Sequence, residues 1–486
     1  MEIKEVIGKI EIKYKIIPIQ VKLALWLTFC TLVQKGITVL TVPIFTRLMD
    51  TADYGRVSAY FSWLNIASII CSFKLNAGVY NKGLSKYKDD QEGYCLAMQY
   101  TTSLITIVVY FVYLIFHTSI NKFTEMGTFI TSLMFLEILF STSMGFWSVR
   151  KQYLFQYKPV VLATLLYAFI NPILGLLFVL NTSYEERGTA RICSTVLAQV
   201  LVGAFFYIVN IKKGKYKFRK EYSYFAIIFN LPLIPHYFSE YILNQSDRIM
   251  IQKMCSYTQV AFYSVAYNAG MLMTIITSSL NQVMTPWLYQ SLDNEELDQI
   301  SKVLISLAII IMLPTIVFIA LAPEALYILA GTEYISSVYA IPPVAGSVVF
   351  LFLYTNFANI EFYYNYNKFT MYISMAGAVL NVVLNCVFIK IFGYVAAGYT
   401  TFACYLVYCV GHYIFVEHII KKNLGRQLIK GKYLVILFTF LLVIMLLMSV
   451  TYKWKLFRYG IIALLLLCVV INYKSIVNVL KIVKRN

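Results

Sequence analysis

The stretch that decides the fold is Lys35–Tyr60, which reads KGITVLTVPIFTRLMDTADYGRVSAY. Its first half completes an apolar run from about residue 21 to 46. That run is long enough to cross a bilayer as a helix, because about 20 apolar residues suffice. No A-x-A-like cleavage site follows it, so we expect it to remain in the protein rather than be removed as a signal. Beyond a short polar turn, a second apolar run begins near residue 56.

The composition extends this interpretation to the whole chain. Of the 486 residues, 60% are hydrophobic and 13% are charged, and the mean hydropathy is +0.70. Soluble domains are about half apolar and a quarter charged, so too few polar groups remain here to cover a soluble surface. This excludes ordinary cytosolic domains and a disordered chain. The composition predicts an all-α integral membrane protein.

Apolar runs of membrane-spanning length recur along the chain. We predict fourteen transmembrane helices, at about 21–46, 56–80, 94–116, 126–149, 159–180, 190–210, 223–246, 258–281, 302–323, 336–358, 369–391, 395–417, 433–452 and 457–474. The loops between them are too short for a folded domain outside the membrane. Any activity must therefore lie within the membrane or at its faces.

The net charge is explained by topology. Lys and Arg number 41 against 23 Asp and Glu, which gives +18. An even number of spans puts both termini on one side. If that side is the cytoplasm, most basic residues fall in cytoplasmic loops and tails, as the positive-inside rule requires. The charge therefore indicates orientation and not a nucleic-acid partner. The basic loops also suit contact with anionic membrane lipid.

Two short motifs indicate an internal repeat. Arg47-Leu48-Met49 is followed by GRVSAY at 55–60, and Arg248-Ile249-Met250 is followed by FYSVAY at 262–267. Six spans per copy give both copies one orientation, which predicts two pseudo-symmetric six-helix lobes with a site between them. The predicted divisions are a basic cytoplasmic N-terminal segment (1–20), an N-lobe (21–210), a basic cytoplasmic linker (211–222), a C-lobe (223–420), and two C-terminal helices with a cytoplasmic tail (421–486).

The chain resembles the Wzx-type polysaccharide flippases. Their superfamily also holds the multidrug and toxin exporters and the peptidoglycan lipid flippase. The resemblance rests on the opening stretch, on LPLIPHYFSEYILNQSDRIMIQKM at 231–254, and on Asn381 followed by FGYVAAGYTT at 392–401. One departure is Val260-Ala261, where the family more often shows a Gly before the Tyr-Ser-Val-Ala run.

The resemblance implies a transporter and not an enzyme. Such a protein moves an undecaprenyl-diphosphate-linked oligosaccharide across the inner (cytoplasmic) membrane for surface polysaccharide synthesis, by alternating access between the lobes. It implies that the polymerase and glycosyltransferases of the same pathway are further partners. No cofactor is expected. The nine cysteines form no CxxC pair and no Cys/His cluster with metal spacing, so no metal site is expected either.

Four basic residues are candidates for a cationic cavity that binds the substrate. Lys35 lies in the middle of span 1, Lys74 lies in the inner half of span 2, and Arg47 and Arg248 occupy equivalent ends in the two repeats. Charges at membrane depth usually face a bundle interior, and Lys and Arg can replace the hydration of a diphosphate. The alternative is that Arg47 and Lys74 reach the membrane interfaces, where acidic neighbours could pair with Arg47.

Four further residues are candidates for ion or proton coupling: Glu137, His236, Glu240 and Asp247. His236 and Glu240 are four residues apart and share a helix face, so they could carry a proton or form a purely structural pair. Asp247 and Arg248 are adjacent, point apart, and therefore need different partners. Span 1 holds no acidic residue, so one common cation site of the drug exporters is missing.

Three other functions remain open. The flippase of the peptidoglycan precursor lipid shares the fourteen spans and the cationic cavity. A cation-coupled multidrug exporter normally stops at twelve spans. A membrane polysaccharide polymerase usually has a long extracytoplasmic loop or a soluble domain, which this chain lacks.

Overall fold

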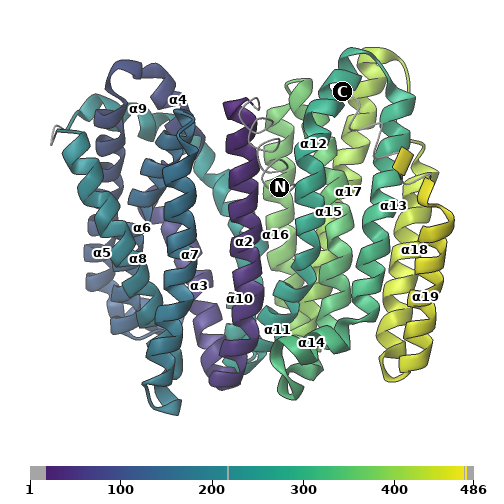
Figure 1. The fold of residues 1–486 in the computed structure, drawn as a ribbon, viewed down its shortest axis with the longest axis horizontal. Helices are drawn as coiled ribbons and strands as arrows, with labels where there is room; N and C mark the ends of the chain where they lie inside the picture. Colours follow the sequence, from purple (N-terminus) through teal and green to yellow (C-terminus); the bar gives the residue numbers. More distant parts are fainter. Residues whose placement is uncertain (1–17, 216–217, 475–476, 479–486) are drawn as a thin grey trace, which may run out of the picture. The chain divides into compact units, whose positions relative to one another are not determined.

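The computed structural model describes residues 18–215, 218–474 and 477–478, and in these residues every regular element is a helix (Figure 1). The all-α prediction is confirmed for this part of the chain. The predicted N-terminal segment (1–20) lies largely outside the described residues, as does the end of the tail. The α-helices are α2 (Ile19–Leu48), α3 (Thr51–Ser72), α4 (Gly78–Lys86), α5 (Gln91–Thr124), α6 (Thr128–Tyr153), α7 (Tyr157–Leu180), α8 (Arg187–Lys213), α9 (Lys220–Asn230), α10 (Ile234–Met254), α11 (Tyr257–Gly270), α12 (Thr274–Asp293), α13 (Leu297–Ala320), α14 (Ala322–Ala330), α15 (Ile341–Tyr363), α16 (Asn367–Phe392), α17 (Val395–Leu424), α18 (Gly431–Val450) and α19 (Lys455–Ile471).

Eleven helical segments in the described residues are long and apolar enough to cross a membrane. They are 19–48, 88–124, 128–153, 157–180, 184–213, 257–293, 297–320, 332–363, 368–392, 395–424 and 431–453. The predicted spans near α3, α10 and α19 are helical but do not reach that standard. α3 and α10 carry charged residues, and α19 is only 17 residues long. The chain is thus a multi-span membrane protein, with eleven of the fourteen predicted spans supported.

The chain folds into two compact units. Unit 1 comprises the residues up to Met49 and Trp63–Tyr237, and unit 2 comprises Asp50–Ser62 and the residues from Phe238 onward. The limits of the units fall between α2 and α3, inside α3 and inside α10, whereas the sequence places the division at the basic linker 211–222. Each unit has its own packing.

In unit 1, α2 packs against α7, α7 packs against α8, and α8 packs against α6 (Figure 1). The interior contains polar bridges between helices. Asn210 of α8 donates to Gln99 Oε1 of α5 at 2.7 Å and to the carbonyl of Ser143 of α6 at 3.1 Å. Hydrogen bonds between helices, together with close packing, hold membrane bundles together. The polar residues on these apolar helices therefore stabilise unit 1.

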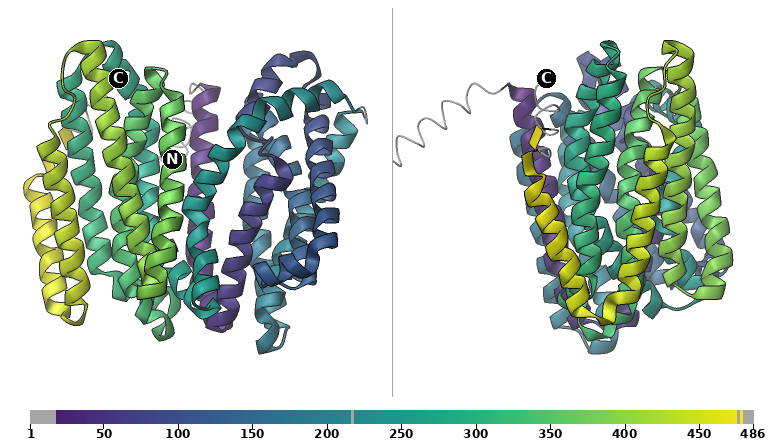
Figure 2. Two further views of the ribbon diagram at one scale, coloured as in Figure 1. Left: turned by 180° about the vertical axis from the view of Figure 1, so that it is seen from behind. Right: turned by 90° about the vertical axis from the view of Figure 1, so that its right-hand side faces the viewer.

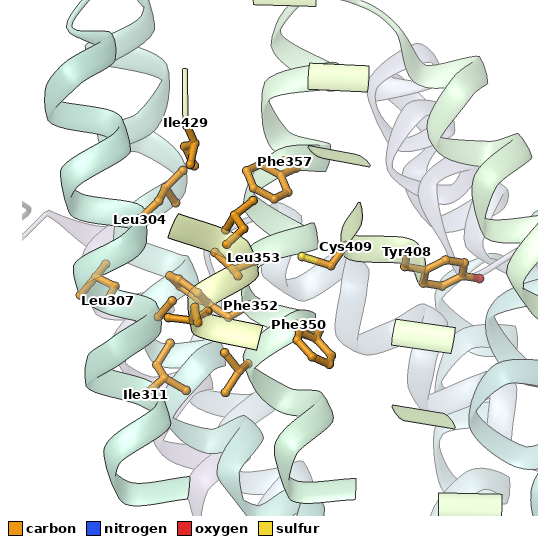
Figure 3. Packing of buried hydrophobic residues seen from close by; sticks show 14 of the residues in the cluster. Leu304, Leu307, Ile311, Phe350, Phe352, Leu353, Phe357, Tyr408, Cys409 and Ile429 are labelled. Carbon is orange, nitrogen blue, oxygen red and sulfur yellow. The ribbon is translucent and has the colours of Figure 1, made fainter. Parts of the chain in front are cut away.

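In unit 2, the apolar core lies between α13, α15 and α17 (Figure 3). Leu304, Leu307 and Ile311 of α13 face Phe352 and Leu353 of α15. Within a bilayer such contacts stabilise by van der Waals packing rather than by removal of water. The pair α18–α19 forms a hairpin that packs on α13 and α15 of this unit (Figure 2).

A close contact between α3 and α11 explains a glycine of the opening stretch. A Cβ on Gly55 would lie 1.8 Å from the carbonyl oxygen of Tyr257, so only glycine lets the start of α3 approach α11 this closely.

Lys74 does not lie in a span. α3 ends at Ser72, and Phe73 and Lys74 both adopt φ +49° in the turn before α4. The prediction that Lys74 lies within span 2 is therefore wrong.

Candidate functional site

Unit 2 contains a fully buried carboxylate. Asp247 of α10 is 0% exposed, and its oxygens accept hydrogen bonds from three neutral groups. The donors are the Tyr263 hydroxyl of α11 at 2.5 Å, the Asn385 amide of α16 at 2.6 Å, and the Thr401 hydroxyl of α17 at 2.9 Å. Hydrogen bonds to a carboxylate offset part of its desolvation cost. Asp247 thus connects four helices.

Arg248 turns away from Asp247 and has its own partners. Its Nε donates to Ser264 Oγ at 3.1 Å and its Nη1 donates to the Asn244 carbonyl at 3.1 Å. The guanidinium also lies 4.5 Å from the centre of the Tyr267 ring, a cation–π distance. The prediction that Asp247 and Arg248 need different partners is confirmed. Arg248 is buried within unit 2.

Unit 1 contains a guanidinium that the sequence did not single out. Arg191 of α8 donates to Asn171 Oδ1 of α7 at 2.8 Å and to Thr195 Oγ1 at 2.8 Å. It also lies 4.4 Å from the centre of the Phe45 ring of α2. A Cβ on Gly175 would come within 2.7 Å of Arg191 Nη1, so glycine at this position makes room for the guanidinium.

Beside Arg191 lies a cavity with a volume of about 260 Å³. Its walls come from α2, α7 and α8, and it is lined by Gln34, Ile37, Thr38, Thr41, Tyr167, Ala168, Asn171, Pro172 and Arg191. The Thr38 and Thr41 hydroxyls donate to carbonyls of their own helix, those of Gln34 and Thr38, both at 3.0 Å. Their oxygen lone pairs can still accept hydrogen bonds from a ligand or water.

The two clusters occupy corresponding places in the predicted repeat. α2, α7 and α8 match the predicted first, fifth and sixth spans of the first copy. In the second copy, α10 covers only the latter part of the predicted span 223–246, and α16 and α17 match the fifth and sixth spans. One cluster holds a cation beside a cavity, and the other holds a fully buried carboxylate. The signal that could have found Arg191 is its spacing of four from Thr195, which places both on one helix face.

The predicted cationic residues are not brought together around this cavity. Lys35 is partly buried in the middle of α2. Arg47 is exposed in the last turn of α2, where its Nη1 donates to the Pro43 carbonyl at 2.9 Å. Lys74 lies in the turn after α3, and Arg248 belongs to unit 2. None of the four lines the Arg191 cavity.

The residues predicted to couple transport to ions or protons differ from one another in burial and in contacts. Glu137 is buried on α6 and interacts with Tyr167. His236 has a buried Nδ1 without a hydrogen-bond partner, and Glu240 is exposed. In the part of the chain that the structure describes, no hydrogen bond joins His236 to Glu240. Their common helix face does not produce the expected pair.

The buried histidine–carboxylate pair is formed by other residues. His412 Nδ1 of α17 lies 2.8 Å from Glu361 Oε1 of α15, and Thr370 of α16 donates to Glu361 Oε2 at 2.6 Å. The His412 ring stacks on Tyr354 with centroids 5.7 Å apart. Sequence reasoning missed this pair because its members are 51 residues apart and share no local motif.

No metal site accompanies these clusters. Within residues 18–215, 218–474 and 477–478, no group of three His, Cys, Asp or Glu side chains could hold a metal ion. The polar clusters offer hydrogen bonds, two guanidinium cations and buried carboxylates. Such groups suit binding and conformational coupling.

The chain belongs to the polysaccharide biosynthesis protein family, whose model matches residues 21–292. A second model, MatE, matches residues 232–387. A relative from Haemophilus influenzae, the Lsg locus putative protein 1, is 23% identical over 364 residues, which cover 72% of this chain and 86% of the relative. The resemblance to flippases of this superfamily is confirmed at the level of family.

Solved structures support the same fold. The lipid II flippase MurJ in an inward closed conformation aligns with a TM-score of 0.71 at 13% identity, covering 93% of this chain and 100% of MurJ. An inward-facing multidrug resistance MATE family transporter of the MOP superfamily aligns with a TM-score of 0.56 at 13% identity, covering 80% of this chain and 99% of that protein. The fold is thus that of MurJ and the MATE transporters.

Proposed function

We propose that this protein translocates undecaprenyl-diphosphate-linked oligosaccharide repeat units across the cytoplasmic membrane for surface polysaccharide biosynthesis. The observation that carries the proposal is the match of the polysaccharide biosynthesis family over residues 21–292. Alternating access between the predicted six-helix lobes, 21–210 and 223–420, moves the head group while the lipid tail stays in the bilayer. Both termini lie in the cytoplasm, and the pathway's polymerase and glycosyltransferases act beside the protein.

The substrate carries negative charge through an apolar barrier, and buried cations lower that cost. Lys35, Arg47, Lys74 and Arg248 are the proposed cationic contacts. Lys35 is foremost among them because it is partly buried and lies too far from either end of α2 to reach the interface easily. Arg248 already stacks on Tyr267 and bonds Ser264, so its contribution is to position this part of unit 2.

Proton or ion coupling is assigned to the predicted carboxylates and histidine. Asp247 already accepts three hydrogen bonds, and Glu137 is buried on α6. The exposed Glu240, with His236 one turn earlier, is therefore the foremost candidate for coupling.

Export of surface polysaccharide tests the proposal. In a strain that lacks its own flippase for lipid-linked repeat units, the wild-type chain should restore surface polysaccharide. The Lys35→Ala variant should abolish export at normal protein level, whereas Lys390→Ala, which alters an exposed lysine of α16, should export normally. Failure of the wild-type chain contradicts the proposed function. Full export by Lys35→Ala contradicts only the role of Lys35.

The rival functions are separated by two further measurements. Rescue of a strain depleted of its peptidoglycan lipid flippase would favour that function, which the alignment with all of MurJ supports. A raised resistance to cationic drugs would favour a multidrug exporter, which the MatE match over 232–387 supports. We expect neither effect. A polymerase role would require polymer formation by the purified chain.

A further inference from the structure

The cavity beside Arg191 is a built polar site inside unit 1. We propose that it binds a phosphate oxyanion of the lipid-linked substrate, and this proposal rests on the proposed function. The site is distinct from the four cations expected from the sequence, because none of them lines it.

The position of the guanidinium is fixed from three sides. Asn171 Oδ1 and Thr195 Oγ1 each accept from it at 2.8 Å, and the Phe45 ring lies 4.4 Å from it. These contacts hold the guanidinium in place at the wall of the cavity. Gly175 supplies the space that the guanidinium fills. An arginine held in this way is preorganised for an oxyanion, which it can bind through two parallel hydrogen bonds.

The cavity has the size and the donors for a phosphate group. Its volume of about 260 Å³ is several times the roughly 30 Å³ that one water molecule occupies in the liquid. Tyr167 and Gln34 add a hydroxyl and an amide to the wall, and both are hydrogen-bond donors. Glu137 interacts with Tyr167 but does not line the cavity. The lining therefore presents one cation and two neutral donors.

The depth of the site indicates the step at which it acts. Arg191 is the fifth residue of α8, about 6 Å along the axis from the start of that helix. With both termini in the cytoplasm, α8 starts and α2 ends at the outer face. The cavity then lies in the outer half of unit 1. It would hold the phosphate late in translocation, before release.

Binding by purified protein tests the site directly. Farnesyl diphosphate should raise the apparent melting temperature of the wild-type protein in detergent, and farnesol, which lacks phosphate, should not. Arg191→Gln should weaken the response to farnesyl diphosphate at least ten-fold. The response of Arg191→Lys should lie between those of the wild type and Arg191→Gln. Thr41→Leu puts a larger side chain in the cavity wall while keeping every partner of Arg191, so it should weaken binding as well. Lys122→Gln, at an exposed lysine of α5, is the matched control.

The outcomes separate this inference from the proposed function. Wild-type affinity in both Arg191→Gln and Thr41→Leu would overturn it, as would an equal response to farnesol. An equal response to glucuronate would assign the cavity to a sugar carboxylate and overturn the phosphate assignment. If the wild-type chain fails to restore export yet binds farnesyl diphosphate through Arg191, the cavity site stands and the proposed function falls. With export restored, Arg191→Gln should lower it at least ten-fold.

Discussion

The Arg191 cluster of unit 1 and the Asp247 cluster of unit 2 are both polar clusters within helical bundles, yet the charges at their centres are opposite. Arg191 is partly buried and lines a cavity, whereas Asp247 is fully buried and accepts three hydrogen bonds. Unit 1 thus holds an open polar site and unit 2 a closed one. The function of each bundle depends on the residues that it carries and not on its helical architecture alone.

The closed Asp247 cluster connects several helices, whereas the open Arg191 cluster leaves hydrogen-bonding groups available to a ligand. The donors to Asp247 come from α11, α16 and α17, so one carboxylate holds three helices to α10. In unit 1, the Thr38 and Thr41 hydroxyls donate only to their own helix. We therefore expect changes in the unit 2 cluster to act mainly on stability and changes in the unit 1 cluster mainly on transport.

The largest effect should come from Asp247→Leu. The change leaves the Tyr263, Asn385 and Thr401 donors without their acceptor, at a cost of roughly 1–3 kcal/mol for each buried group. The apparent melting temperature in detergent should fall sharply, and much of the protein should be lost during purification. Asp298→Leu, at an exposed carboxylate of α13, should have little effect. If Asp247→Leu is as stable as the wild type, the closed cluster does not stabilise unit 2 in the way proposed.

The buried pair of Glu361 and His412 should give a similar loss of stability, and a second substitution should restore part of it. Glu361→Leu should destabilise by about 3–5 kcal/mol, because it removes one partner of a buried pair and leaves His412 behind. Adding His412→Phe should recover part of that loss, since two apolar groups of suitable shape no longer need hydrogen bonds. A double-mutant cycle on apparent melting temperatures measures the coupling. Simple additivity of the two losses would show that the pair is not coupled.

The smallest effect should come from an ion pair in unit 2 that joins a buried arginine to a partly exposed carboxylate. Arg458 of α19 donates to both oxygens of Glu324 of α14 at 2.8 Å, and these hydrogen bonds lower the pKa of Glu324 to about 2. Because this pKa is below its ordinary value of 4.5, the stabilisation is complete above about pH 4.5 and is lost as the pH falls through about 2. Screening limits it to about 1 kcal/mol.

Glu324→Gln should therefore lower the apparent melting temperature slightly at pH 7, and the difference from wild type should vanish near pH 2. Glu333→Gln, at an exposed carboxylate close by in the sequence, is the control. A difference that persists unchanged at low pH would mean that charge is not its source.

Membrane helices were largely predictable from the sequence, because each needs only a local run of apolar residues. Local spacing also predicted that Asp247 and Arg248 have separate partners. The same reasoning misplaced Lys74, since nothing in the apolar run reveals that α3 ends at Ser72. It paired His236 with Glu240 from their spacing, but no hydrogen bond joins them in the described residues. Glu361 with His412, and Asn171 with Arg191, depend on contacts between helices that are remote in sequence.

The Asp247 cluster has a consequence for synthesis. Its first partner, Tyr263, follows 16 residues later, but Asn385 and Thr401 follow 138 and 154 residues later. At about 5–20 residues per second, translation of 154 residues takes roughly 8–30 s. During that interval, α10 enters the membrane with a carboxylate whose partners are incomplete. A chain that terminates before α17 never completes them, so full-length translation is a condition for burying this charge.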